Sequence, residues 1–181
     1  MSQDLRMEPV DGFNGSPFVP TGNPMIDGVG PASWAQRADV PDLTAHGKPK
    51  IVPMQVATDF SIAEGDPDPR GLPVRACDGV VAGTISDLWV DRSEPQVRYY
   101  EVTLATGGRH VLLPVTFVAW PNLGLFGLDH VRVKAITAAQ FSEVPGTKSR
   151  TEITLLEEDK ICAYYGGGHL YATPDRSQPL L

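Results

Sequence analysis

The sequence contains few cysteines and few basic residues for its length. Two cysteines occur in 181 residues, Cys77 and Cys162. They form no CxxC pair and have no histidine at metal-ligand spacing beside them, so neither a disulfide framework nor a zinc site is indicated. Lys and Arg number 15 against 22 Asp and Glu, which gives a net charge of −7. Nucleic acids bind surfaces rich in Lys and Arg, so we expect no nucleic-acid partner.

Uninterrupted apolar runs and common catalytic motifs are absent too. Residues 1–13 lack the basic and apolar regions of a signal peptide. The longest charge-free run, 111–128, is interrupted by Pro114 and Pro121, so no membrane anchor is expected in the chain as given. No nucleophile elbow, P-loop, dinucleotide-binding or HExxH motif occurs, and the four histidines share no spacing. These absences argue against the common classes of enzyme.

What the sequence does have is an uneven distribution of charge. Residues 1–94 hold 14 acidic and 7 basic residues, whereas residues 95–181 hold 8 of each. An acidic surface concentrates cations, protons included, within a Debye length of about 10 Å. The simpler interpretation is a solvated face that keeps the domain soluble.

Residues 1–71 are predicted to be an irregular segment. Prolines recur in it too closely for helices or central strands. Phe13, Trp34 and Phe60 are nevertheless scattered through it, and disordered segments are poor in such residues. We therefore predict an extended, Pro-rich segment that packs on the rest of the chain or on partner subunits.

Residues 72–150 have the pattern of a small antiparallel β-barrel, which makes the chain mainly β. Short runs rich in Val, Ile, Leu, Trp and Tyr alternate with turn residues. The imperfect alternation within 84–91 also indicates a bulge. The predicted strands are 72–76, 80–91, 97–104, 109–119 and 129–136.

One or two short helices are predicted near the C-terminus. The first is expected at 137–144. Thr154 and Glu157 match a capping box that begins a second helix, and the glycines 166–168 are expected to end it. Residues 151–181 therefore form a helix followed by a surface tail.

Two groups of titratable residues could carry protons. Asp91 and Glu94 lie at a predicted strand end, where Arg98 can reach back to them. Neighbouring carboxylates hold protons more tightly and a neighbouring guanidinium loosens them, so such a group can be tuned to pass protons. Asp42 and His46 place a carboxylate and an imidazole in the Pro-rich segment, and imidazole exchanges protons readily near neutral pH. The simpler interpretations are a polar turn and a solvated loop.

Four strings of the sequence resemble the cytoplasmic domain of the H subunit of the purple-bacterial photosynthetic reaction centre. The resemblance extends from about residue 11 to residue 174. It implies an irregular N-terminal stretch followed by a PRC-type β-barrel. Members carry a transmembrane helix ahead of this domain. Either truncation has removed it here or the anchor lies on a separate chain, and we favour truncation. The strings are 20–34, 71–75, 87–91 and 154–165.

The resemblance implies a non-catalytic role in photosynthesis. The H subunit caps the L and M subunits on the cytoplasmic face of the bacterial inner, chromatophore membrane, while this chain alone is expected to be soluble. It shields the secondary quinone and contributes to proton uptake and transfer during light-driven electron transport. No cofactor is expected to bind this chain directly; bacteriochlorophyll, bacteriopheophytin, quinones and non-haem iron belong to the assembled complex.

By the same resemblance, the proton-carrying residues can be assigned roles. Glu94 and Asp91 would be inner relay carboxylates tuned by Arg98, with His46 near the surface and Asp42 assisting it. Two positions depart from the family pattern: Thr44 stands where a carboxylate is expected, and Lys48 where a second histidine is expected. Lysine buffers poorly at neutral pH, so the surface cluster is reduced to His46 and Asp42.

Two other functions stay open at this point. One is a stand-alone PRC-barrel module that docks on another protein or on RNA, although the net charge and the N-terminal strings argue against it. The other is a small hydrolase built on Asp91 and Glu94, which lacks a recognisable nucleophile.

Overall fold

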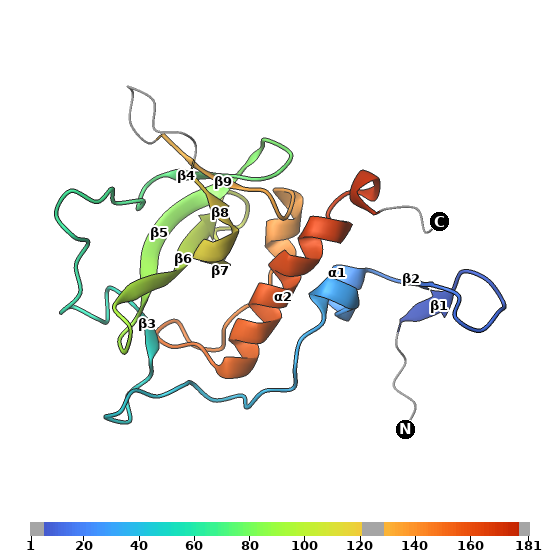
Figure 1. The fold of residues 1–181 in the computed structure, drawn as a ribbon. Helices are drawn as coiled ribbons and strands as arrows, with labels where there is room; N and C mark the ends of the chain where they lie inside the picture. Colours follow the sequence, from blue (N-terminus) through green and yellow to red (C-terminus); the bar gives the residue numbers. More distant parts are fainter. Residues whose placement is uncertain (1–5, 121–128, 178–181) are drawn as a thin grey trace.

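The computed structural model describes residues 6–120 and 129–177 (Figure 1). The predicted mainly β fold is confirmed, because strand residues outnumber helical ones. The strands are β1 Met7–Pro9, β2 Phe18–Pro20, β3 Ile51–Pro53, β4 Pro73–Arg75, β5 Val81–Asp91, β6 Gln96–Leu104, β7 His110–Pro114, β8 Val118–Ala119 and β9 Val131–Val133. The α-helices are α1 Pro24–Asp27 and α2 Leu155–Tyr171, and the 3-10 helices are η1 Gly30–Ala32, η2 Val115–Phe117, η3 Ala139–Glu143 and η4 Pro174–Arg176.

Seven strands form one sheet in the order β7-β6-β5-β4-β9-β8, and β3 also pairs with β5. Every pair is antiparallel except β4 with β9, which is parallel. In the described ranges β7 and β8 do not pair, so the sheet is curved without closing into a barrel (Figure 1). The predicted strand 109–119 is divided because the chain turns through η2 after Pro114, whose ring has no N–H to extend the ladder.

β5 contains the bulges that its sequence pattern indicated. Its register with β6 shifts between Ile85 and Asp87 and again between Trp89 and Val90. Each bulge turns the following side chains relative to the pleat, and residues 87–91 are all buried. Two carboxylates, Asp87 and Asp91, thus lie in the interior together with Trp89.

Helix α2 begins at the predicted capping box but does not end where it was expected to. The Glu157 N–H donates to Thr154 Oγ1 at 3.2 Å, and the Thr154 N–H donates to Glu157 Oε2 at 2.9 Å. The prediction that the glycines 166–168 end the helix is wrong, because α2 continues to Tyr171. A Cβ on Gly167 would lie 2.5 Å from the Cβ of Ala32, and one on Gly168 would lie 2.5 Å from the Ala135 carbonyl oxygen. Close packing is therefore the reason for these glycines.

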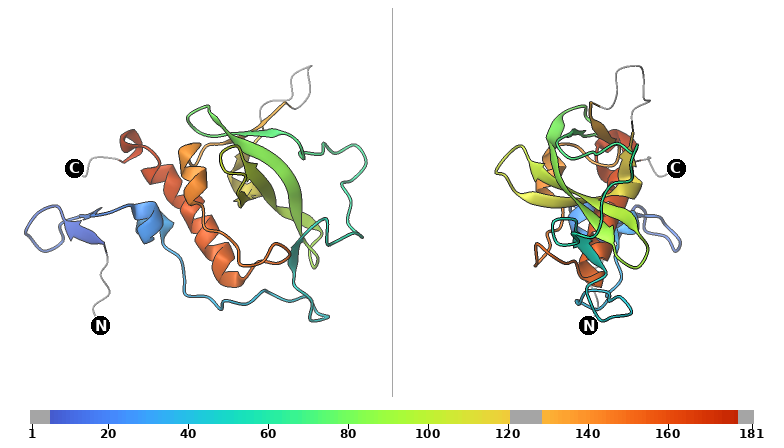
Figure 2. Two further views of the ribbon diagram at one scale, coloured as in Figure 1. Left: turned by 180° about the vertical axis from the view of Figure 1, so that it is seen from behind. Right: turned by 90° about the vertical axis from the view of Figure 1, so that its left-hand side faces the viewer.

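The N-terminal segment has few regular elements, as predicted, and it packs on α2. Helices α1 and η1 contact one side of α2, while β7 contacts α2 as well. Figure 2 shows α2 between the sheet and these N-terminal elements, with the β1–β2 hairpin extending away from the body. From η1 the chain runs along the molecule to β3, which brings residues 42–50 to the end of β5 (Figure 1).

The two cysteines are free and partly exposed. The short helix expected at 137–144 is present as the 3-10 turn η3. Its Phe141 is fully buried beside Tyr165 of α2, with ring centroids 6.0 Å apart. Tyr165 also stacks on Phe117, at 5.5 Å between centroids. This aromatic group joins α2 to the sheet.

Replacing Tyr165 with phenylalanine should stabilise the chain. The Tyr165 hydroxyl is buried and has no hydrogen-bond partner in the described part of the chain, and such a group costs about 1–3 kcal/mol of desolvation. The matched control is Tyr164→Phe, because the Tyr164 hydroxyl donates to the Gln140 carbonyl at 2.9 Å. Urea unfolding should show a higher midpoint for the first variant and a lower one for the second. Destabilisation by Tyr165→Phe would contradict the conclusion that the buried Tyr165 hydroxyl lacks a hydrogen-bond partner in the described part of the chain.

Candidate functional site

Asp91, the last residue of β5, organises the turn that follows it. Its side chain is 3% exposed. Oδ1 accepts hydrogen bonds from the N–H groups of Ser93, at 2.8 Å, and Glu94, at 3.1 Å. This is an Asx-type turn, which Asp forms because its short side chain reaches the backbone two and three residues on. Asp91 thereby fixes the position of Glu94.

The ammonium group of Lys50 lies close to the carboxylates of both Asp42 and Asp91. Its Nζ lies 3.6 Å from Oδ2 of Asp42 and 3.6 Å from Oδ2 of Asp91. The three side chains form a gradient of burial, since Asp42 is 48% exposed, Lys50 25% and Asp91 3%. Sequence reasoning placed the two carboxylates in separate groups and missed Lys50. Only the pairing of β3 with β5, in the register Ile51 opposite Asp91, joins them.

The remaining predicted residues lie around this cluster. Glu94 is exposed, and its Oε2 accepts a hydrogen bond from Gln96 Nε2 at 3.3 Å. His46 lies on an exposed turn organised by Thr44, whose Oγ1 accepts from the N–H groups of His46, at 3.4 Å, and Lys48, at 3.3 Å. Within the described ranges, no hydrogen bond or ion pair joins the His46 imidazole to the carboxylates. Thr44 therefore shapes the turn.

Arg98 faces a different carboxylate from the one expected. It is exposed on β6, and its charge acts on Glu158 and Cys162 of α2. The cation beside Asp91 is Lys50. The structure thus brings Asp42 and Asp91 together, while the charge of Arg98 acts on two residues of α2.

Glu158 is a further acidic group of this region that sequence reasoning missed. Its Oε2 accepts a hydrogen bond from the Tyr99 hydroxyl at 3.0 Å. Burial raises the pKa of Glu158, and Asp42 adds to the rise, while the Tyr99 hydrogen bond, Arg98 and Arg37 oppose it. Burial likewise raises the pKa of Tyr99. The capping box marked the helix start, but nothing local indicated that the next glutamate faces Tyr99.

The raised pKa of Glu158 predicts a specific pH dependence of stability. The folded state binds the proton of the Glu158 carboxyl group more tightly than the unfolded chain does. The stability that this proton adds is fully present below the ordinary pKa of 4.5 and is lost as pH rises through the folded-state pKa. Urea unfolding between about pH 4 and pH 7 should therefore show a smaller fall in stability for Glu158→Gln than for the wild type. Glu152→Gln, a partly exposed carboxylate before α2, is the control. Equal slopes for Glu158→Gln and the wild type would contradict the prediction.

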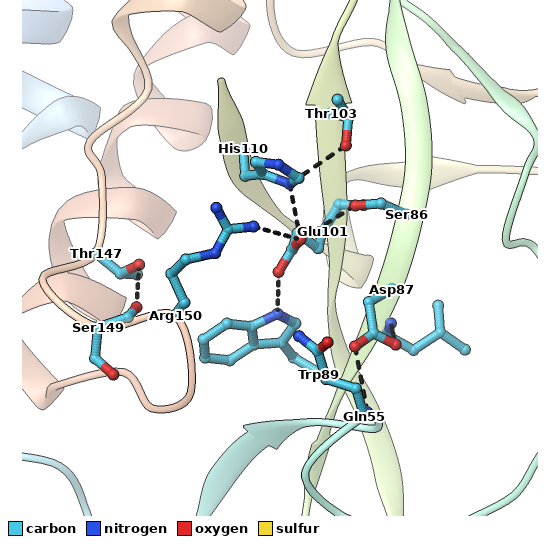
Figure 3. Close-up of polar contacts among 11 residues, drawn as sticks. Gln55, Ser86, Asp87, Trp89, Glu101, Thr103, His110, Thr147, Ser149 and Arg150 are labelled. Carbon is cyan, nitrogen blue, oxygen red and sulfur yellow. Dashed lines mark hydrogen bonds and ion pairs between the residues drawn. The ribbon is translucent and has the colours of Figure 1, made fainter. Parts of the chain in front are cut away.

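A second polar cluster surrounds Glu101 of β6 (Figure 3). The Glu101 side chain is 7% exposed. It accepts hydrogen bonds from Trp89 Nε1 at 3.1 Å and Ser86 Oγ at 3.2 Å. His110 Nδ1 lies 2.8 Å from Oε1, and the Arg150 guanidinium lies 3.8 Å from it. Four side chains from two strands, β5 and β7, and a loop thus converge on one carboxylate of β6. Sequence reasoning missed this because the bulges of β5 aim Trp89 inward.

The contacts around Glu101 differ from those of a catalytic triad. A cavity of about 670 Å³ adjoins the cluster, with Asp87 and Glu101 among its lining residues. Serine, histidine and glutamate occur together, but Ser86 donates to Glu101. In a catalytic triad the serine donates to the imidazole and the imidazole to the carboxylate. His110 is therefore not placed to take the proton of Ser86, and we interpret the cluster as structural.

In residues 6–120 and 129–177, no three His, Cys, Asp or Glu side chains come together as metal ligands. None of the helices in those ranges is both long and apolar enough to span a bilayer. The part of the charge-free run 111–128 that the structure describes consists of a short strand, a 3-10 turn and a second short strand, as the prolines indicated; the rest lies outside the described residues.

Comparison with protein families matches two successive parts of the chain. Residues 1–56 match the photosynthetic reaction centre H-chain N-terminal region. Residues 61–138 match the PRC-barrel domain. The first match includes Asp42, His46 and Lys50, and the second includes Asp91 and Glu94. With both matches in the order that the sequence resemblance implied, the chain is an H-subunit-like protein that carries a PRC-barrel domain.

Proposed function

We propose that this chain is the H subunit of a photosynthetic reaction centre and contributes to proton transfer toward the secondary quinone. In that role it caps the cytoplasmic side of the L and M subunits. The observation that carries the proton-transfer part is the gradient from exposed Asp42, through Lys50, to buried Asp91. Glu94, on the turn that Asp91 holds, is the next carboxylate along the chain.

The need for such a route follows from electrostatics. Electrons that reduce a quinone inside a protein leave negative charge in a medium of low dielectric constant, which is costly until protons arrive. Carboxylates joined by one or two waters can carry those protons because each both accepts and donates. Asp42 and His46 collect protons at the surface, and Asp91 and Glu94 pass them on toward the quinone.

The charge distribution supports the same function. All of the net charge of −7 arises from residues 1–94, the half that contains Asp42, His46, Asp91 and Glu94. An acidic surface raises the local concentration of protons. Bacteriochlorophyll, bacteriopheophytin, the quinones and the non-haem iron are assigned to the other subunits of the complex.

Co-purification tests the subunit assignment. A tagged form of this chain is expressed in a phototrophic bacterium that lacks its own H subunit. We expect it to purify with two membrane subunits and with bacteriochlorophyll absorbance. Recovery with a soluble partner and without pigment would contradict the assignment and would favour a stand-alone PRC-barrel module.

A further inference from the structure

Lys50 joins two segments through its backbone as well as through its side chain. Its N–H donates to the Asp42 carbonyl at 2.8 Å, and its carbonyl accepts from the Arg92 N–H at 2.9 Å. The preceding residue is held too, because Arg92 Nε donates to the Pro49 carbonyl at 3.0 Å. The turn that carries His46 is therefore fastened to the end of β5 at this residue.

The ammonium group of Lys50 contacts both carboxylates without being fixed to either. Each Nζ–Oδ2 distance is 3.6 Å, which is longer than the roughly 2.7–3.2 Å of a direct N–H···O hydrogen bond. A lysine ammonium is a compact charge on a flexible stem, so it can move toward one oxygen or the other. The nearby guanidinium of Arg92 is occupied at the Pro49 carbonyl.

Resting on the proposed function, we propose that Lys50 is a positioning residue of the proton route, which holds Asp42 and Asp91 at a common cation and couples their charges. A proton from water neutralises Asp42, and the ammonium then pairs with Asp91 alone. The proton moves through water to Asp91 and onward to Glu94, and the ammonium returns to Asp42. Lys50 keeps its own protons throughout, so no proton is gained or lost by the lysine.

The burial of Asp91 is the reason that this coupling matters. A buried carboxylate without a partner is strongly unfavourable, and in the described part of the chain the ion pair of Asp91 is with Lys50. Asp42, which is 48% exposed, is the carboxylate that Lys50 connects to the interior.

The test uses reaction centres assembled with variants of this chain and measures flash-induced reduction of the secondary quinone. Lys50→Met should slow the second, proton-coupled reduction by about tenfold, less than the loss expected for a group that itself transfers the proton. The first reduction should be unchanged. Lys50→Arg, which keeps the charge, should restore the rate to within about twofold of the wild type. An added small weak acid should accelerate the second reduction in Lys50→Met, because it delivers protons without the Asp42–Lys50–Asp91 cluster.

Three comparisons decide the outcome. Lys48→Met, on the same turn but exposed, is the matched control and should behave as the wild type. If Lys50→Arg is as slow as Lys50→Met and the weak acid has no effect, Lys50 is only structural and the proposal is wrong. If Lys50→Met matches the wild type while Asp91→Asn is slow, the route stands without Lys50.

Two further results separate the remaining cases. If the Lys50, Asp42 and Asp91 variants all match the wild type, the proposed function itself is wrong. Should Lys50→Met fail to assemble, Asp42→Asn tests the same coupling with Lys50 in place. It should slow the second reduction and respond to the weak acid, and a wild-type rate for it would overturn the proposal.

Discussion

Replacing Glu94 with glutamine in an assembled reaction centre should slow the second, proton-coupled reduction of the secondary quinone by about 100-fold. Glutamine has nearly the same shape as glutamate but cannot take up and release a proton at neutral pH. The backbone N–H of residue 94 would still donate to Asp91, so the turn should persist. Flash kinetics resolve the effect, because the first reduction needs no proton and should keep its rate.

A matched carboxylate serves as the control for Glu94. Glu64→Gln makes the same chemical change at another exposed position and should leave both reductions unchanged. If Glu94→Gln gives a wild-type second reduction, the relay role of Glu94 is wrong, whatever the outcome for Lys50. If both variants are slow, the effect comes from the overall acidic surface.

The largest loss of stability is expected from Trp89→Ala. Trp89 is 1% exposed at the centre of the sheet, and removing a buried aromatic side chain costs about 3–5 kcal/mol. Trp89→Phe separates packing from hydrogen bonding, because the ring is kept while Glu101 Oε2 loses its indole donor. That variant should lose about 1–3 kcal/mol. Urea unfolding followed by far-UV circular dichroism measures both losses without relying on tryptophan fluorescence.

Trp120→Ala is the control for this pair. Trp120 is 39% exposed and contacts Tyr100 edge-on, with centroids 6.2 Å apart. Its removal should cost clearly less than that of Trp89, because 39% of Trp120 stays in contact with water and only 1% of Trp89 does. Equal losses for the two tryptophans would contradict the placement of Trp89 in the core.

Local signals in the sequence predicted the elements of the fold well. The capping box at Thr154 and the turn residues between strands act within a few residues, so both can be read without knowing the fold. The prediction that the glycines 166–168 end the helix was wrong, because the contacts that require glycine there are made with residues distant in the sequence. Gly167 and Gly168 face Ala32 and Ala135, and no local pattern distinguishes a glycine that ends a helix from one that permits close packing.

The candidate site was predicted only in part, for the same reason. Asp91 and Glu94 were identified because they are three residues apart in a turn. Their connection to Asp42 depends on the pairing of β3 with β5, which the sequence pattern did not predict. The domain boundaries at 71 and 150, and the proton-carrying roles of the five predicted residues, stay predictions.

The pairing of β3 with β5 determines how long Lys50 and Asp42 stay beside Asp91. β3 is held to the sheet by three residue pairs with β5, whereas β5 and β6 share a much longer ladder. Three residue pairs alone would open easily in local fluctuations, but all three residues of β3 are buried. Burial of this strand therefore holds Lys50 and Asp42 beside Asp91. On the proposed function, the fraction of time that β3 spends docked sets an upper limit on proton flow, independently of any protonation equilibrium.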